Sequence, residues 1–410
     1  MDRPQTSLHV AVRSKIEWLA GNLSRVTSTG ELIPEVDGLR FIAISAVLFH
    51  HLLSMFLSGS GRSPEVRTYS GWFAAADQSW LVIPAYCGHF GVNLFFVISG
   101  FILALPFAKR AFNGKAAPDL KSYYLRRVTR IEPPYLLNLI VIFLIHWRQW
   151  GEGPQVVPNL IASLFYSHGL VYGRESAING VAWSLEVEIQ FYLLTPLLVL
   201  IFRLRNVVAR RSLIVALIAG FGMLSQWVIY PSGSARLSLT LLNFAHYFLT
   251  GFLLVDLYLT GRLRGADKRL SWDLATLAGA AAIFATLSRF GQFYFLLPLM
   301  VGLLYAGFFM GRLSNAIARA RWITIIGGMC YTIYLYHILI ISNLMTQTIS
   351  MASITRPLDL DFALQCLLIL PVVLAVCALL FFYAEKPFMR WSLSPPQAKN
   401  LKAAEVPAGD

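Results

Sequence analysis

Charged residues are scarce in this chain of 410 residues, since only 13% are Asp, Glu, Lys or Arg. Soluble domains carry about 25% charged residues, so the composition excludes an ordinary water-soluble protein. Hydrophobic residues make up 57% of the chain. Apolar stretches of about 20 residues, long enough to cross a bilayer, recur along almost the whole length. The sequence therefore predicts a polytopic membrane protein.

Cysteine is also rare. The chain has four cysteines, which show no paired or metal-ligand spacing: Cys87, Cys330, Cys366 and Cys377. Three lie in apolar runs, so we interpret them as small core residues and expect no metal cofactor. Tandem repeats are absent, and residues 1–36 lack the short apolar core of a cleavable signal peptide.

The apolar segments predict an all-α fold, a bundle of about ten transmembrane helices. The expected spans are 37–58, 88–108, 134–147, 182–203, 212–231, 237–258, 272–289, 291–310, 322–345 and 362–384. The segment 157–172 is expected to be re-entrant or interfacial. We expect a cytoplasmic N-terminal segment over 1–36, a transmembrane domain over 37–388 and a cytoplasmic tail over 389–410.

The net charge of +13 follows the expected topology. With the N-terminus inside, 26 of the 34 Lys and Arg residues fall in inside segments and 7 in outside segments, and Arg40 lies in the first span. This bias is the positive-inside signal, and it predicts that both termini are cytoplasmic. Membrane topology therefore explains the excess of Lys and Arg residues, and we expect no nucleic-acid partner.

The first span carries two polar residues that are costly in a membrane and mark a functional site by default, Arg40 and His51. Eleven residues separate them, which places them within roughly 20° of one helix face and about 16 Å apart along the axis. One face thus carries a cation near one membrane surface and a titratable base deep inside. His50 points about 100° away from His51, and we expect it to pack.

A cluster of arginines, Arg126, Arg127 and Arg130, stands directly before the expected third span. Arg127 and Arg130 are at i and i+3, so they project from one face of a helical turn and can bind a polyphosphate bidentately. The alternative is anchoring to anionic lipid headgroups.

Two carboxylates begin the fourth span, and they point to different faces because they are two residues apart. We expect Glu186 to act as a helix N-terminal cap. Glu188 lies deeper and is expected to face the bundle with a polar partner, because a carboxylate facing lipid is expensive. In the second span, the Ser99-Gly100 pair permits close approach of a helix or of a slim ligand.

His337, in the ninth span, is either a core residue bonded across helices or a member of the site. Counting 1.5 Å per residue from the span edges places it at about the same depth as His51 and Glu188.

Six short motifs follow one another along residues 34–388: Asp37-Gly38-Leu39-Arg40 with His51 after ten more residues, Phe95-Phe96-Val97-Ile98-Ser99-Gly100-Phe101, Arg127-x-x-Arg130-Ile131, Trp183-Ser184-Leu185-x-x-Glu188-x-x-Phe191-Tyr192-x-x-x-Pro196, Tyr331-x-x-Tyr334-Leu335-x-His337 and Glu385-Lys386-Pro387. In this order they resemble acyltransferase family 3, the membrane-bound O-acyltransferases typified by bacterial O-antigen acetylases. Cys330 departs from the family, which commonly has serine there, and we expect only a packing adjustment.

The resemblance implies that the arginine–histidine pair and the Arg-x-x-Arg motif serve acyl donor use and transfer. We therefore expect Arg126, Arg127 and Arg130 to bind the phosphates of acyl-CoA. His51 is expected to act as general base, or alternatively as a transient acyl carrier. Four further candidates complete the site: Ser99, Trp183, Tyr331 and His337.

The resulting hypothesis is an O-acyltransferase of the bacterial inner membrane. It would move an acyl group, most simply acetyl, from cytoplasmic acyl-CoA to a hydroxyl of a cell-surface or exported glycan or glycolipid. Glu188 would orient the histidine or the acceptor, with Arg40 near the donor. Two alternatives stay open: an acyltransferase for a small hydroxylated metabolite such as a macrolide, and a non-catalytic transporter, although no paired half-repeats are visible.

Overall fold

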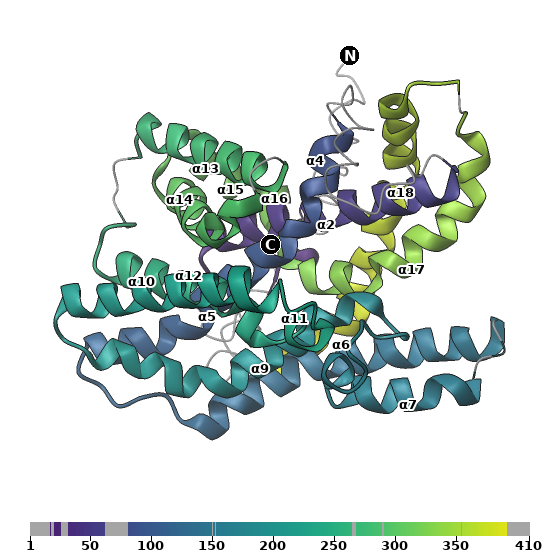
Figure 1. Ribbon diagram of the computed structural model, residues 1–410. Coiled ribbons are helices and arrows are strands. Elements are labelled where there is room, and N and C mark those ends of the chain that lie inside the picture. Colours follow the sequence, from purple (N-terminus) through teal and green to yellow (C-terminus); the bar gives the residue numbers. More distant parts are fainter. Residues whose placement is uncertain are drawn as a thin grey trace, which may run out of the picture.

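The computed structural model describes residues 17, 20–25, 32–61, 81–149, 151, 153–264, 268–288, 291–353 and 355–391. It is 84% helical, and no strand occurs among the described residues (Figure 1). The expected all-α fold is confirmed. Most of the two terminal segments, 1–36 and 389–410, lies outside the described residues.

Nine helical stretches in the described part of the chain are long and apolar enough to cross a membrane. They are α2 (Pro34–Gly59); α4 (Val82–Cys87) with η1 (Gly88–Phe90) and α5 (Gly91–Phe112); α6 (Leu120–Gln149); η2 (Gly180–Ala182) with α9 (Trp183–Leu198) and η3 (Val199–Arg203); α10 (Val207–Leu224) with η4 (Ser225–Ile229); α11 (Ala235–Ser238) with α12 (Leu241–Leu259); α13 (Leu270–Ser288); η5 (Gly291–Leu296) with α14 (Leu297–Met310); and α18 (Leu358–Leu380) with η7 (Phe381–Glu385) and α19 (Lys386–Trp391).

A tenth span is formed by two helices, α16 (Arg321–Gly328) and α17 (Cys330–Thr348), if they are counted as one. They meet at a bend of 70°. The predicted number of spans is therefore confirmed, but the expected straight helix over 322–345 is wrong. Counting the depth of His337 along a straight helix is wrong for the same reason. Gly327 lies at the bend, where its backbone packs directly against the Asp37 carbonyl of α2.

The third span begins earlier than expected. The expected span, 134–147, begins at the second of two prolines, residues that lack the N–H needed for helical hydrogen bonds. The structure instead has one helix, α6, that runs through Pro133 and Pro134 from Leu120. Neighbouring helices in a membrane protein can stabilise such a segment, and the Tyr331 hydroxyl of α17 donates to the Ile131 carbonyl beside the prolines. The arginine cluster therefore lies on α6 itself.

Four short elements connect the spans: α7 (Gly153–Leu164), α8 (His168–Tyr172), α15 (Leu313–Ala318) and η6 (Ile349–Met351). The segment 157–172 comprises most of α7 and all of α8, neither of which is long enough to cross a membrane. Helix α7 packs along α6 (Figure 1).

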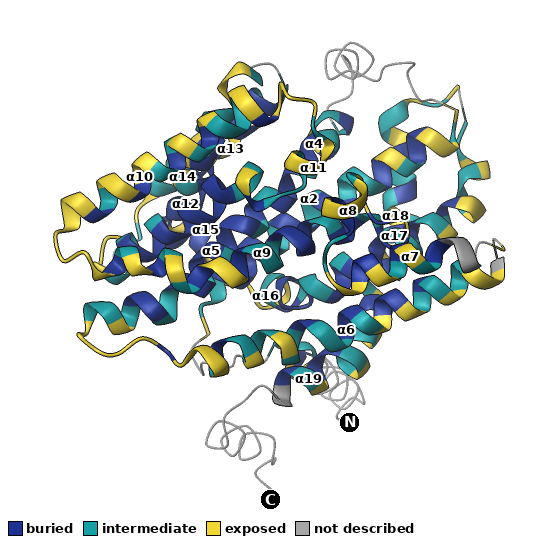
Figure 2. Ribbon diagram, turned by 60° about the horizontal axis from the view of Figure 1, so that its bottom comes forward, coloured by how far each residue is buried: buried dark blue, intermediate teal, exposed yellow. Residues whose placement is uncertain are grey.

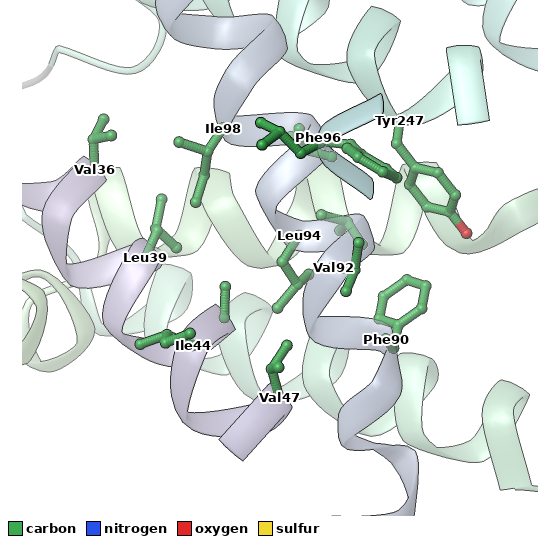
Figure 3. Close-up of a cluster of buried hydrophobic side chains, with 14 of the residues drawn as sticks. Val36, Leu39, Ile44, Val47, Phe90, Val92, Leu94, Phe96, Ile98 and Tyr247 are labelled. Atoms are coloured by element: carbon green, nitrogen blue, oxygen red, sulfur yellow. The ribbon is translucent and has the colours of Figure 1, made fainter. Parts of the chain in front are cut away.

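The core is centred on α5 and α12, which are largely buried, while α10 and α13 present exposed faces (Figure 2). Small residues allow α5 and α12 to cross closely: an added Cβ at Gly100 of α5 would collide with the Phe248 backbone of α12. Gly251 of α12 lies equally close to the α5 backbone. Figure 3 shows the adjoining apolar contact, in which side chains of α2 meet those of η1, α5 and α12: Val36, Leu39, Ile44, Val47, Phe90, Val92, Leu94, Phe96, Ile98 and Tyr247.

Candidate active site

Five helices, α2, α5, α6, α9 and α17, surround a cavity of about 930 Å³, its open mouth included. Its polar and tyrosine side chains are Arg40, Ser99, Arg127, Arg130, Ser184, Glu188, Tyr192, Tyr331 and Tyr334, together with Cys330. The rest of the wall is apolar: Val92, Phe95, Phe96, Ile98, Ile102, Leu103, Ile131 and Leu185. We call this space the arginine cavity.

Arg40 reaches the arginine cavity from the first turns of α2 and is paired with an acid there. Its Nη1 lies 2.6 Å from Oδ1 of Asp37, one helical turn earlier. The same oxygen is 3.2 Å from Nη1 of Arg25. One buried carboxylate therefore serves two arginines, and the Asp37–Arg40 part of the first motif is an ion pair. This pairing reduces the cost of a buried cation.

Arg127 and Arg130 enter the cavity from α6. The Arg127 guanidinium lies over the Tyr123 ring at 5.7 Å, and its buried Nε has no hydrogen-bond partner in the described part of the chain. Neither arginine forms an ion pair within the described residues. Their charge is thus available to an anion. Arg126, also named as a candidate from the sequence, is half-buried and does not line the cavity.

Glu188 lies inside the bundle, where two hydroxyls hold it. Its Oε1 accepts hydrogen bonds from Ser99 Oγ at 2.5 Å and from the Tyr192 hydroxyl at 2.6 Å. Ser99 was a candidate site residue from the sequence, but Tyr192 was not. Tyr192 follows Glu188 by four residues, which is the spacing of neighbours on one helix face. Glu186, in contrast, makes no helix cap: its Oε2 accepts the N–H of Gly169 and ties α9 to α8. The capping expectation is therefore wrong.

Two tyrosines of α17 close the cavity. Tyr331 is anchored by its hydrogen bond of 2.9 Å to the Ile131 carbonyl. The Tyr334 hydroxyl donates to the Val181 carbonyl at 2.8 Å and is 2.6 Å from Ser184 Oγ. Tyr334 was not selected as a site residue from the sequence, although it stands in one of the motifs. Cys330 also lines the cavity, so its departure from the family pattern falls on the cavity wall.

His51 does not line the arginine cavity. Its ring instead faces His337, with centroids 5.1 Å apart. The His337 ring is 5.9 Å from that of Tyr334, which does line the cavity. The sequence predicted that His51 and Glu188 share a cavity, but the structure places Tyr334 and His337 between this cavity and His51. On α2, Arg40 therefore lines the arginine cavity, whereas His51 contacts His337 of α17.

His50 and Trp183 lie outside the arginine cavity. His50 is held by Nδ1, which donates to the Tyr86 carbonyl at 2.9 Å. Trp183, a sequence candidate, packs on Phe244 and Phe96 with ring centroids 5.3 Å and 6.3 Å away, and it does not line the cavity.

A family model described as an acyltransferase domain matches residues 33–382. The chain belongs to acyltransferase family 3. The expected family is thereby confirmed over nearly the predicted range, and all six motifs lie in or directly after the matched segment. The arginine cavity therefore lies in a protein of the acyltransferase class.

Two curated relatives of this family member are O-acetyltransferases. The chain is 26% identical to the peptidoglycan O-acetyltransferase OatA of Listeria monocytogenes, over 79% of this chain and 51% of that protein. It is 26% identical to the O-acetyltransferase OatA of Staphylococcus aureus strain NCTC 8325, over 43% of this chain and 27% of that protein. The chain thus spans about half or less of the length of these relatives. No solved structure matches it.

Proposed function

We propose that the protein transfers an acyl group, most simply acetyl, from acyl-CoA to a hydroxyl of a cell-surface or exported glycan. The observation that carries this proposal is the arginine cavity of an acyltransferase-family chain, with Arg127 and Arg130 not ion-paired within the described residues. The name of the Listeria monocytogenes relative, a peptidoglycan O-acetyltransferase, supports a glycan acceptor.

The donor binds with its phosphates on Arg127 and Arg130, because planar guanidinium groups bind phosphate oxygens bidentately. Arg40, which shares the Asp37 carboxylate with Arg25, extends this cationic surface. Glu188 uses one carboxylate oxygen for Ser99 and Tyr192. The other oxygen can accept an amide N–H of the pantetheine arm, so Glu188 orients the donor. This role replaces direct contact with His51.

The thioester then extends along α2 and past Tyr334 towards His51, about 16 Å beyond Arg40 along the helix axis. His51 takes the proton of the acceptor hydroxyl as its oxygen attacks the thioester carbonyl. The C–S bond breaks, the CoA thiolate leaves, and the proton on His51 passes to that thiolate. The products are an O-acyl ester and free CoA.

This chemistry fits a multi-pass protein of the bacterial inner membrane with both termini cytoplasmic. The basic residues are concentrated in the segments assigned to the inside, and acyl-CoA is supplied from that side. The arginine cluster near the beginning of α6 would then face the cytoplasmic pool of donor.

The test is to incubate the purified full-length protein in lipid nanodiscs with acetyl-labelled acetyl-CoA and measure free CoA thiol and labelled ester. We expect the release of thiol to depend on an added glycan acceptor. In a second experiment, a strain in which the gene for this protein is deleted should lack acetyl groups on its surface glycan. Release with small hydroxylated metabolites alone would favour the metabolite alternative. Binding of acetyl-CoA without any loss of the thioester would contradict the enzyme and favour a transporter.

A further inference from the structure

A pair of histidines lies outside the arginine cavity, where α2 meets α17. His337 is fully buried, and its Nδ1 lies 2.8 Å and 3.0 Å from the carbonyl oxygens of Tyr334 and Ile333. A carbonyl oxygen only accepts hydrogen bonds, so Nδ1 must carry the proton. The neutral ring then presents an unprotonated Nε2.

That Nε2 is buried and has no hydrogen-bond partner among the described residues. A buried polar atom without a partner costs free energy and is unusual in a folded protein. The His337 ring lies beside the His51 ring, at a centroid distance of 5.1 Å and an interplanar angle of 50°. An imidazole N–H···N hydrogen bond of about 2.9 Å fits this ring separation after a small rotation of the His51 ring.

The two remaining histidines nearby are held differently. His50 and His89 both direct Nδ1 to the Tyr86 carbonyl, at 2.9 Å and 3.0 Å. These histidines are not arranged to hold a metal ion, since no group of three or more metal-ligating side chains in the described part of the chain is so placed. Within this cluster, His51 is the histidine whose ring contacts that of His337.

We propose that His337 is a positioning residue for His51: its Nε2 accepts a hydrogen bond from one ring N–H of His51. The Tyr334 and Ile333 carbonyls fix His337, and His337 fixes the tautomer and orientation of His51. The second ring nitrogen of His51 then has its lone pair free for the proton of the acceptor hydroxyl. No proton moves to His337, whose acceptor nitrogen stays in place when His51 becomes imidazolium. This inference rests on the proposed role of His51 as general base.

The proposed arrangement is similar to a catalytic triad, in which a third group orients the base that accepts a proton from the nucleophile. Here the third group is a neutral imidazole, which suits a membrane interior because it brings no buried charge. It also explains why an ionisable side chain is fully buried in α17 without contacting the arginine cavity.

The test compares His337→Leu, His337→Gln and a matched control, His246→Leu. His246 is buried in another span, α12, and likewise has a ring nitrogen without a partner among the described residues. Glutamine keeps an acceptor oxygen close to the position of Nε2, whereas leucine removes it. The measurements are kcat and KM for acetyl-CoA and the Kd of CoA in nanodiscs.

We expect His337→Leu to lower kcat by about 10- to 100-fold, a part of the 10²- to 10⁴-fold contribution typical of a general base. The KM of acetyl-CoA and the Kd of CoA should change less than about twofold, because His337 lies outside the donor cavity. His337→Gln should recover a large part of kcat, and His246→Leu should change it little. The proposal would be overturned if His337→Leu and His246→Leu lost kcat equally, or if His337→Leu and His337→Gln did.

The proposed function fails in a different way. Wild-type protein that does not consume acetyl-CoA refutes the acyltransferase assignment before any variant is made. An active wild-type enzyme with an unaffected His337→Leu variant leaves the proposed function intact and removes only the positioning role.

Discussion

The Ser99 hydroxyl of α5 lies 2.5 Å from Oε1 of Glu188 on α9, and this hydrogen bond joins two helices that are far apart in the sequence. The adjacent residue, Gly100, faces a third helix, α12, whose backbone it touches. Neighbouring positions of one motif thus have separate roles. Ser99 lines the arginine cavity, whereas Gly100 sets the distance between helices.

Glu188→Gln should weaken donor binding without unfolding the protein. Glutamine keeps an acceptor for Ser99 and Tyr192 but loses the negative charge, and hydrogen bonds to charged groups contribute about 1.5–3 kcal/mol. We expect the KM of acetyl-CoA to rise about 10-fold, with kcat changed less than about threefold. Ser99→Ala, which leaves the Tyr192 bond, should raise KM by about threefold. If steady-state kinetics showed the wild-type KM for both variants, Glu188 would have no role in donor binding.

Arg127→Ala and Arg130→Ala should each raise the Kd of CoA by about 10-fold or more, because each loses a charge-assisted phosphate contact. Lysine should restore affinity only in part, since a point charge replaces a planar fork. Arg126→Ala is the matched control: it belongs to the same cluster but does not line the cavity. Equal effects of all three alanine variants on CoA binding would favour lipid anchoring as the role of the cluster.

His51→Ala should lower kcat by about 10²- to 10⁴-fold, the range of a lost general base. Membrane insertion and the Kd of CoA should stay at wild-type values, because His51 lies outside the arginine cavity. His50→Ala removes only a hydrogen bond to the Tyr86 carbonyl and should be far milder. The opposite ranking of the two variants in the thiol-release assay would show that the wrong face of α2 has been assigned.

Asp37→Asn should destabilise the fold, because it leaves Arg25 and Arg40 buried without their shared carboxylate. Breaking a buried pair in this way costs about 3–5 kcal/mol. The control is Glu35→Gln in the same helical turn. Its ion-pair partner Arg319 is 55% exposed and 3.7 Å away, and such pairs contribute about 1 kcal/mol or less. Asn315, which donates to Glu35 Oε1 at 3.1 Å, can donate equally to the glutamine oxygen. Thermal unfolding of the purified variants measures both effects, and similar midpoints would contradict the shared-carboxylate account.

Gly100→Ala should also be destabilising, by about 1–3 kcal/mol, since its added methyl group meets the Phe248 backbone and forces α5 from α12. Gly220→Ala on the exposed face of α10 has nothing within 4 Å of the new Cβ. It should be neutral or stabilise the helix by up to about 1 kcal/mol. Comparing the yield and unfolding temperature of the two variants tests whether this crossing depends on the glycine.

Several candidate residues could be found from the sequence because their cost in a membrane makes them conspicuous. Arg40, Arg127, Arg130 and Glu188 were selected as charged groups in or beside apolar segments, and all four line the arginine cavity. Their partners were harder to find. Asp37 stands one turn from Arg40, but its second partner, Arg25, comes from outside the span.

Hydrophobicity and charge are local properties, so the amino-acid sequence was sufficient to predict an all-helical membrane protein and to identify residues that cannot face lipid. It could not predict which of those residues meet. The bend between α16 and α17, the continuity of α6 through Pro133 and Pro134, and the pairing of His51 with His337 depend on how distant helices cross. Close backbone contacts such as those of Gly100 and Gly327 set this crossing geometry, and such contacts exist only after the helices have packed together.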